Sequence, residues 1–204
     1  MKKKEFETIG KQLLPILPGF VVKGDLLFMR PIGHILRAIC FDRSIDPRSF
    51  YVEVFVQPFF VPMEYVVFNF GYRLGGNCHS WNADNPNLIA ELRAGLKRDA
   101  LPFLSQITSV SDFVKMAKSH PSGNPHTPEA IAFALARAGR NKEAIEVLDQ
   151  LLGQVKLEVL WQREMADRAK SLKSQLLTDP AAAQRQLDAW EAETVKNLGL
   201  EEFR

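Results

Sequence analysis

The hydrophobic pattern of this chain changes its period along the sequence, and that change constrains the fold more than any other feature. Between residues 20 and 74 apolar and polar residues alternate, which is typical of strands, where successive side chains point to opposite faces. Before residue 20 and after Gly75 and Gly76, apolar residues recur every three or four positions, as in amphipathic helices. The sequence therefore predicts an α+β fold, in which an antiparallel β-meander of about four strands packs on helices and an all-α region follows.

Four segments between residues 20 and 74 have the composition of strands. β-branched and aromatic residues dominate them, and turn-forming residues separate them. Because the connections are short, antiparallel neighbours are the expected topology. The predicted strands are residues 25–30, 34–43, 50–57 and 65–74.

A proline-rich stretch marks the expected boundary between two domains. Residues 120–128 contain three prolines in nine positions, which interrupts the helical periodicity on either side. We expect an α+β meander domain at residues 1–119, a linker at 120–128 and a helical domain at 129–204. The helical domain should contain a long helix with one inward apolar stripe. That stripe is predicted to comprise Leu157, Leu160, Trp161, Ala169, Leu172 and Leu176.

Composition excludes several classes of protein. The 26 basic and 24 acidic residues leave a net charge of +2, too little for a dedicated nucleic-acid binder. The two cysteines, Cys40 and Cys78, form no CxxC pair, so no disulfide framework is expected. Glu5 and Glu7 follow the first lysines, and the longest apolar run is shorter than a membrane-spanning helix requires. We expect a cytoplasmic protein without a nucleic-acid or membrane partner.

Part of the second half resembles a known repeat. Residues 131–151 read as two short helices joined at Gly139, with small and aliphatic residues at Leu135, Ala136, Ala144 and Ile145. This pattern resembles one tetratricopeptide-type unit, at residues 128–152. The resemblance implies an antiparallel helix pair and, since one copy is visible, no solenoid.

The first half has a broader resemblance. Its matching pieces are residues 6–14, the 19–24 segment, the meander and residues 100–104. Across residues 1–118 they resemble a loosely defined bacterial family of unknown function, with an N-terminal helix, a β-meander and a C-terminal helix. The resemblance implies a fold but no reaction.

Signatures of catalysis are missing from the sequence. It contains no GxxxxGK[ST], GxGxxG, GxSxG or HExxH motif. Cys78, His79, His120 and His126 do not form the closely spaced ligand pairs of structural zinc sites. We therefore predict no catalytic residue, no metal and no cofactor, and consider an enzyme the less favoured reading.

One face of the predicted sheet has an unusual composition. Three apolar sets, one from each of the longer predicted strands, should lie under helices: Leu36, Ala38 and Cys40; Phe50, Val52, Val54 and Val56; and Val66, Phe68, Phe70, Tyr72 and Leu74. The reverse face mixes aromatic and polar residues, as recognition surfaces do. The candidate binding residues on or beside this face are Arg37, Tyr51, Glu53, Phe55, Gln57, Asn69, Arg73 and Trp81.

Three functions remain open at this point. The first is a module that binds a protein partner, in an immunity- or adaptor-like role by analogy. The second is a small-ligand binder or enzyme with a polar cleft on the sheet, in which Glu53 is the general base and the arginines bind an anion. The third is a homodimer whose last two helices pair between chains through Leu172, Leu176, Leu187 and Trp190. Against a ligand or partner surface stands the alternative that the C-terminal helices, or a second copy of the chain, cover the mixed face, with its charges in ion pairs at the edge.

Overall fold

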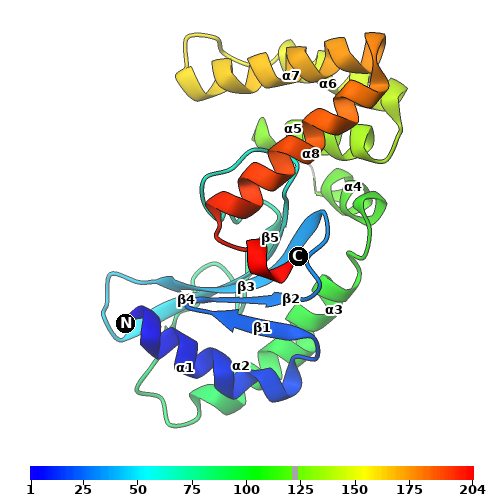
Figure 1. The fold of residues 1–204 in the computed structure, drawn as a ribbon. Helices are drawn as coiled ribbons and strands as arrows, with labels where there is room; N and C mark the ends of the chain where they lie inside the picture. Colours follow the sequence, from blue (N-terminus) through cyan, green and yellow to red (C-terminus); the bar gives the residue numbers. More distant parts are fainter. Residues whose placement is uncertain (121–123) are drawn as a thin grey trace. The chain divides into compact units, whose positions relative to one another are not determined.

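The computed structural model describes residues 1–120 and 124–204 and divides into two units (Figure 1). The first unit comprises Met1–Gln57, Val67–Ile107 and Phe203–Arg204, and the second comprises Pro58–Val66 and Thr108–Glu202. The fold is α+β, with an antiparallel sheet in the first unit and a helical region in the second. Residues 121–123 of the predicted linker lie outside the described residues.

The sheet of the first unit has six strands within the described residues. Its order is β1-β2-β3-β4-β5, with β6 paired to β4. The pairs β1–β2, β2–β3, β4–β5 and β4–β6 are antiparallel, as the short connections predicted. The strands are β1 (Phe20–Lys23), β2 (Leu26–Met29), β3 (Ile35–Arg43), β4 (Ser49–Pro58), β5 (Gly71–Arg73) and β6 (Trp81–Asn82).

Helices cover one face of this sheet. The Phe6 ring of α1 (Lys3–Leu13) lies 5.7 Å from the Phe41 ring of β3 and 5.6 Å from the Phe50 ring of β4. On the same side, the Tyr72 ring of β5 lies 5.4 Å from Phe103 in the α3 helix. Figure 1 shows α1 and α2 on this side. We call it the helix-covered face. Its helices are α1, α2 (Leu88–Gly95), η2 (Leu96–Ala100) and α3 (Leu101–Ser105).

The prediction for β3 placed the wrong residues under the helices. Ile39 pairs with Leu27, and Leu27 lies against Gly10 of α1. Phe41 contacts Phe6. The odd-numbered residues of β3 therefore belong to the helix-covered face, and Leu36, Ala38 and Cys40 belong to the opposite face. Both faces of β3 are largely apolar, so its alternation could not distinguish them.

The last predicted strand is mostly absent. Only Gly71–Arg73 of the predicted segment 65–74 forms a strand, while residues 61–70 are irregular. Residues 58–66 instead belong to the helical unit. There Thr194 of α8 (Pro180–Asn197) accepts a hydrogen bond from the Met63 N–H and donates one to the Val61 carbonyl, both at 3.2 Å. The prediction also missed the short strands β1 and β6.

The helical unit is built around α5. This helix packs against α4, α6, α7 and α8 and is buried throughout residues 129–136. Its alanines allow the close approach of neighbours, and a helix that is apolar on all sides is expected at the centre of a core. The helices are α4 (Val110–Ser119), α5 (His126–Arg137), α6 (Asn141–Leu152), α7 (Leu160–Thr178) and α8 (Pro180–Asn197).

The position of α4 differs from the predicted domain boundary. Because α4 packs on α5, the helical unit begins at Thr108, and the predicted linker at residues 120–128 falls inside it. The helix α5 also begins within that predicted linker, at His126.

The predicted apolar stripe of α7 divides into two parts. Ala169, Leu172 and Leu176 are buried, as predicted. Leu157, Leu160 and Trp161 are not, with exposed fractions of 49%, 67% and 42%. Leu157 precedes the helix, which begins at Leu160, so helical spacing does not apply to it.

The residues of the hypothetical dimer seam are used within the chain. Leu172, Leu176 and Leu187 are buried, and the Trp190 ring stacks on Phe133 with centroids 5.1 Å apart. They form part of the core of the helical unit. Among the described residues, the structure contains no helix whose length and apolar character would allow it to cross a membrane.

Candidate functional site

Three of the predicted site residues meet on the sheet face opposite the helix-covered face. The β4–β5 register places Glu53 opposite Arg73. The Arg73 Nε donates a hydrogen bond to Glu53 Oε1 at 2.8 Å, and the guanidinium lies 3.8 Å from the centroid of the Tyr51 ring. The Arg73 Nη1 also donates to the Asn77 carbonyl at 3.1 Å. We call Tyr51, Glu53 and Arg73 the Arg73 cluster.

The Arg73 cluster is electrically balanced and held in place. The Glu53 side chain is 9% exposed and that of Arg73 is 26% exposed, so the ion pair is only partly screened by water. Cys40 lies near the same carboxylate. Burial, with smaller contributions from Asp25, Asp42 and Glu53, raises the pKa of the Cys40 thiol to about 12. The thiol is therefore protonated at neutral pH and a poor nucleophile.

Two further predicted residues on β4 have structural roles. Phe55 and Gln57 are 0% and 1% exposed. The Phe55 ring contacts Phe68 at 5.1 Å. The Gln57 Oε1 accepts a hydrogen bond from the Val67 N–H at 3.0 Å. Both side chains are occupied in fixing the irregular segment that follows β4.

The remaining predicted residues lie elsewhere. Arg37 has the same parity as Ile39 on β3 and so belongs to the helix-covered face, where burial lowers the pKa of its guanidinium. Trp81 pairs with Phe50 and also belongs to that face. Asn69 is exposed in the irregular segment before β5. The single mixed surface expected from the sequence is therefore reduced to the Arg73 cluster.

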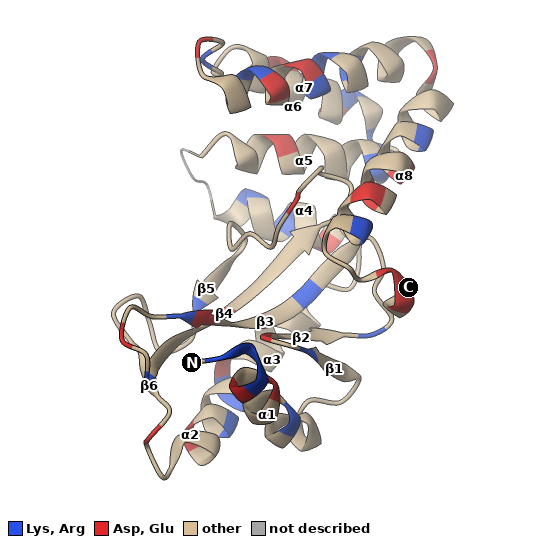
Figure 2. Ribbon diagram, turned by 60° about the vertical axis from the view of Figure 1, so that its left-hand side comes forward, with Lys and Arg blue, Asp and Glu red and all other residues tan. Residues whose placement is uncertain are grey.

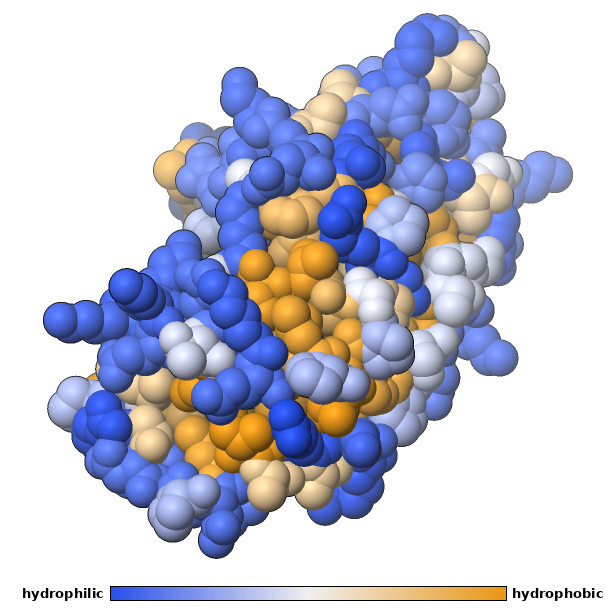
Figure 3. All heavy atoms as spheres, turned by 60° about the horizontal axis from the view of Figure 1, so that its bottom comes forward, coloured by the Kyte–Doolittle hydropathy of each residue, from blue (hydrophilic) through white to orange (hydrophobic). Residues whose placement is uncertain are grey.

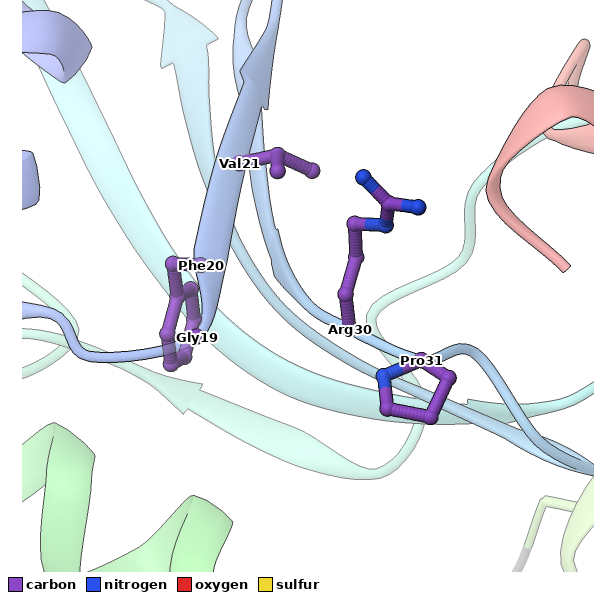
Figure 4. Close-up of a pocket in the computed structure, with 5 residues that line it drawn as sticks. All are labelled: Gly19, Phe20, Val21, Arg30 and Pro31. Carbon is purple, nitrogen blue, oxygen red and sulfur yellow. The ribbon is translucent and has the colours of Figure 1, made fainter.

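A depression lies at the open end of the β1–β2 hairpin, opposite its turn, and away from the predicted site residues (Figure 4). Its volume is about 410 Å³, and its lining combines the end of β1 with Arg30 and Pro31 after β2. The Arg30 N–H donates to the Gly19 carbonyl at 2.8 Å, which extends the β1–β2 pairing to this end of the hairpin. None of the predicted site residues lines it. The lining residues are Gly19, Phe20, Val21, Arg30 and Pro31.

The far end of the sequence returns to this hairpin. The Phe203 ring packs edge-on against Phe28 of β2, with centroids 5.0 Å apart. The Lys23 Nζ and Arg30 Cζ atoms lie 5.4 and 5.6 Å from the centroid of the Phe203 ring. The sequence does not predict this contact, because no local pattern signals a pairing between residues so distant in the chain.

An exposed apolar cluster occurs on the helical unit, and sequence reasoning had placed its members in the core. We call Leu157, Leu160 and Trp161 the α7 patch. The segment that carries Leu157 is held by α7, since Arg163 Nε donates to the Leu157 carbonyl at 2.9 Å and the Lys156 N–H donates to Gln162 Oε1 at 2.6 Å. The Trp161 ring stacks on His126 with centroids 5.0 Å apart.

A buried ion pair joins α5 to α7 near the α7 patch. Glu129 is 0% exposed, and its Oε1 accepts hydrogen bonds from Arg168 Nε and Nη2 at 3.0 and 2.8 Å. The Nδ1 of His126 lies 3.6 Å from Glu129 Oε2. This ion pair links α5, whose His126 stacks on Trp161, to α7, which carries Trp161.

One face of the molecule is drawn in Figure 3, where hydrophilic residues surround hydrophobic residues gathered near the centre. Within the described part of the chain, no group of three or more histidine, cysteine or acidic side chains is placed to hold a metal ion. No family model, no curated protein and no solved structure matches this chain.

Proposed function

We propose that the protein is a protein-binding module without catalytic activity, and that it binds its partner through the α7 patch. The observation that carries this proposal is the exposure of two leucines and a tryptophan within residues 157–161, on a segment held by hydrogen bonds. Grouped exposed apolar side chains are typical of interaction sites, and tryptophan is enriched among the residues that dominate binding energy.

The rigidity of the α7 patch supports the same proposal. The hydrogen bonds from Arg163 and Lys156 fix the backbone on which Leu157 stands, and His126 orients the Trp161 ring. A surface that is already ordered loses less conformational entropy on binding. Around the patch, the cations of Lys156 and Arg163 are offset by Glu158 and Glu164. We therefore expect the partner to offer an apolar groove on a folded protein, with no strong charge of either sign.

The proposal includes an adaptor- or immunity-like role in the cytoplasm. Two free cysteines are in keeping with a reducing compartment. Spacing supports the tetratricopeptide-like packing of the helix pair α5 and α6, because α5 begins at His126 and α7 begins 34 positions later, at Leu160, which is the period of that repeat.

The test compares two equally exposed leucines on the same helix. Leu160 is 67% exposed and Leu177 is 64% exposed, but only Leu160 belongs to the α7 patch. Affinity capture from extracts of the source cells, quantified by mass spectrometry, should recover proteins with wild type and with Leu177→Asp that are lost with Leu160→Asp. Each such protein is then purified and titrated calorimetrically against all three chains, with circular dichroism as the folding control. We expect Leu160→Asp to weaken binding at least about 10-fold.

Two outcomes would overturn the proposal. In the first, the same proteins are recovered in the same amounts with Leu160→Asp as with wild type. In the second, light scattering shows that the wild type self-associates and that Leu160→Asp converts it to a monomer. That result would make the α7 patch a contact between two copies of this chain, and not a site for another protein.

A further inference from the structure

The strand β1 is an edge of the sheet with backbone groups directed outward. It is the first strand in the sheet order and pairs with β2 alone. The hydrogen bond from the Arg30 N–H to the Gly19 carbonyl shows that Gly19 and Arg30 are a hydrogen-bonded pair of the β1–β2 ladder. Paired residues of an antiparallel ladder alternate between bonded and non-bonded positions. Val21 therefore bonds to β2, whereas the N–H and carbonyl of Val22 point away from it.

The neighbouring residue adds a further acceptor. By the same alternation, the Phe20 carbonyl points outward, while the Phe20 N–H is occupied by the Leu17 carbonyl at 3.1 Å. One outward donor and two outward acceptors thus lie along the free edge of β1. An extended chain placed beside it could pair with all three groups, as in the addition of a peptide strand to a sheet edge.

Positive side chains stand near both ends of β1, one on α1 and one just after β2. At the hairpin turn, Lys3 of α1 packs so closely on Gly24 that a Cβ atom there would lie 2.0 Å from Lys3 Cε. At the other end, Arg30 is exposed beside Gly19. Figure 2 shows blue residues in the first turn of α1 and at the β1–β2 end of the sheet. Edge cations discourage pairing with ordinary strands, but they favour a strand that carries carboxylates.

The spacing of the two cations specifies the ligand further. Five residue steps separate Gly19 from Gly24, or roughly 17 Å at about 3.4 Å per residue. Lys3 belongs to the helix-covered side, whereas Arg30 has the parity of Phe28 and lies on the opposite side, where Figure 4 shows it beside Val21. Residues at positions i and i+5 of a strand also point to opposite faces. Two carboxylates at that separation would each meet a cation.

We propose that the β1 edge binds an extended, acidic segment of a partner protein as an added strand. The segment pairs with the outward groups of Phe20 and Val22, and acidic residues at positions i and i+5 meet Lys3 and Arg30. An apolar side chain of the segment occupies the depression of about 410 Å³ beside Phe20, Val21 and Pro31. This surface lies on the sheet unit, so it is independent of the α7 patch and extends the proposed function to a second kind of partner.

The experiment begins with a random decapeptide phage library selected on the full chain. We expect enrichment of peptides with β-branched residues and with acidic residues five positions apart. The enriched peptides are synthesised with fluorescein, and their binding is measured by fluorescence anisotropy. Arg30→Gln and Lys3→Gln should each weaken binding about 10-fold, and Arg43→Gln, at an exposed cation of β3, should leave it unchanged.

Two further measurements test the strand pairing itself. The peptide has two sets of alternate residues, one whose N–H groups face β1 and one whose N–H groups face away. N-methylation of the first set should abolish binding, because it removes the donors that would reach β1. The Val22 amide signal in the NMR spectrum should shift on titration. The proposal is overturned if no peptide is enriched or if Arg30→Gln and Lys3→Gln bind the peptide as wild type does. It is also overturned if N-methylation of neither set of alternate residues affects binding. Leu160→Asp should retain peptide binding, which separates this inference from the α7 patch.

Discussion

The buried ion pair of the helical unit allows a prediction in which a second substitution restores stability. Arg168→Met retains an apolar stem but removes both hydrogen bonds to Glu129, whose carboxylate is 0% exposed. Removal of one partner from a buried pair leaves an uncompensated charge, which typically costs 3–5 kcal/mol. We expect Arg168→Met to lower the free energy of unfolding of this unit by about that amount.

The magnitude follows from the different burial of the two partners. The Arg168 side chain is 23% exposed, so replacing it by methionine changes its hydration little. The cost arises instead at Glu129, where the charge remains without water. Glu129→Gln in the Arg168→Met background neutralises that charge and leaves a buried amide, which costs roughly 1–3 kcal/mol. The double variant should therefore be more stable than Arg168→Met alone, by about 1–3 kcal/mol.

Tryptophan fluorescence can follow this unit separately. Trp161 and Trp190 belong to it and Trp81 to the sheet unit, so urea unfolding is measured in a Trp81→Phe background. Lys170→Met is the matched control, because Lys170 lies on the same helix with a side chain that is 57% exposed. Its effect should stay within about 0.5 kcal/mol. A cost below about 1 kcal/mol for Arg168→Met, or further destabilisation by Glu129→Gln, would refute the reasoning.

Three other predictions concern single residues. Because burial raises the pKa of Cys40 to about 12, only about one molecule in 10⁴ carries that thiolate at pH 8. Iodoacetamide should therefore modify exposed Cys78 and spare Cys40, and equal labelling in a peptide map would contradict this. A Cβ on Gly71 would lie 2.1 Å from a backbone oxygen of β4, whereas one on Gly95 would make ordinary contacts from 3.4 Å. Gly71→Ala should thus lose about 1–3 kcal/mol and Gly95→Ala should gain up to about 1 kcal/mol in urea unfolding; the reverse order would disprove the contact argument. Hydrogen bonds from the residues that cap α4 hold the pKa of Asp112 below its usual range. Its stabilisation is therefore present above the unfolded value of about 3.9 and is lost as pH falls through the lower folded value, so thermal melts of wild type and Asp112→Asn should converge in acid.

The helices could be predicted because their signals are local. Ser109 precedes α4, and its hydroxyl accepts a hydrogen bond from the Asp112 N–H. Pro180 is the first residue of α8, and both residue types are start signals of helices. Caps and first-turn prolines act within four residues of one another, so no knowledge of the tertiary structure is required.

The position of the α7 patch could not be predicted in the same way. Leu157 and Trp161 continue the spacing of buried residues such as Leu172, so the periodicity assigns them to the core. Whether an apolar stripe is covered depends on how far the neighbouring helix extends. Here α6 ends at Leu152 and α7 begins at Leu160, and that limit is not visible in the sequence of α7 itself.

The error over the last strand and the assignment of Gln57 to a binding surface have one physical origin. A strand through Val67 would use its N–H in a ladder with β4 and leave the Gln57 side chain for other partners. Instead residues 58–66 join the helical unit through Thr194, and the Val67 N–H donates to Gln57. A polar residue on a sheet can therefore serve a nearby irregular backbone as readily as a ligand, because buried backbone groups require partners. Composition alone cannot separate these roles, and the Arg73 cluster becomes distinct only when the register pairs Glu53 with Arg73.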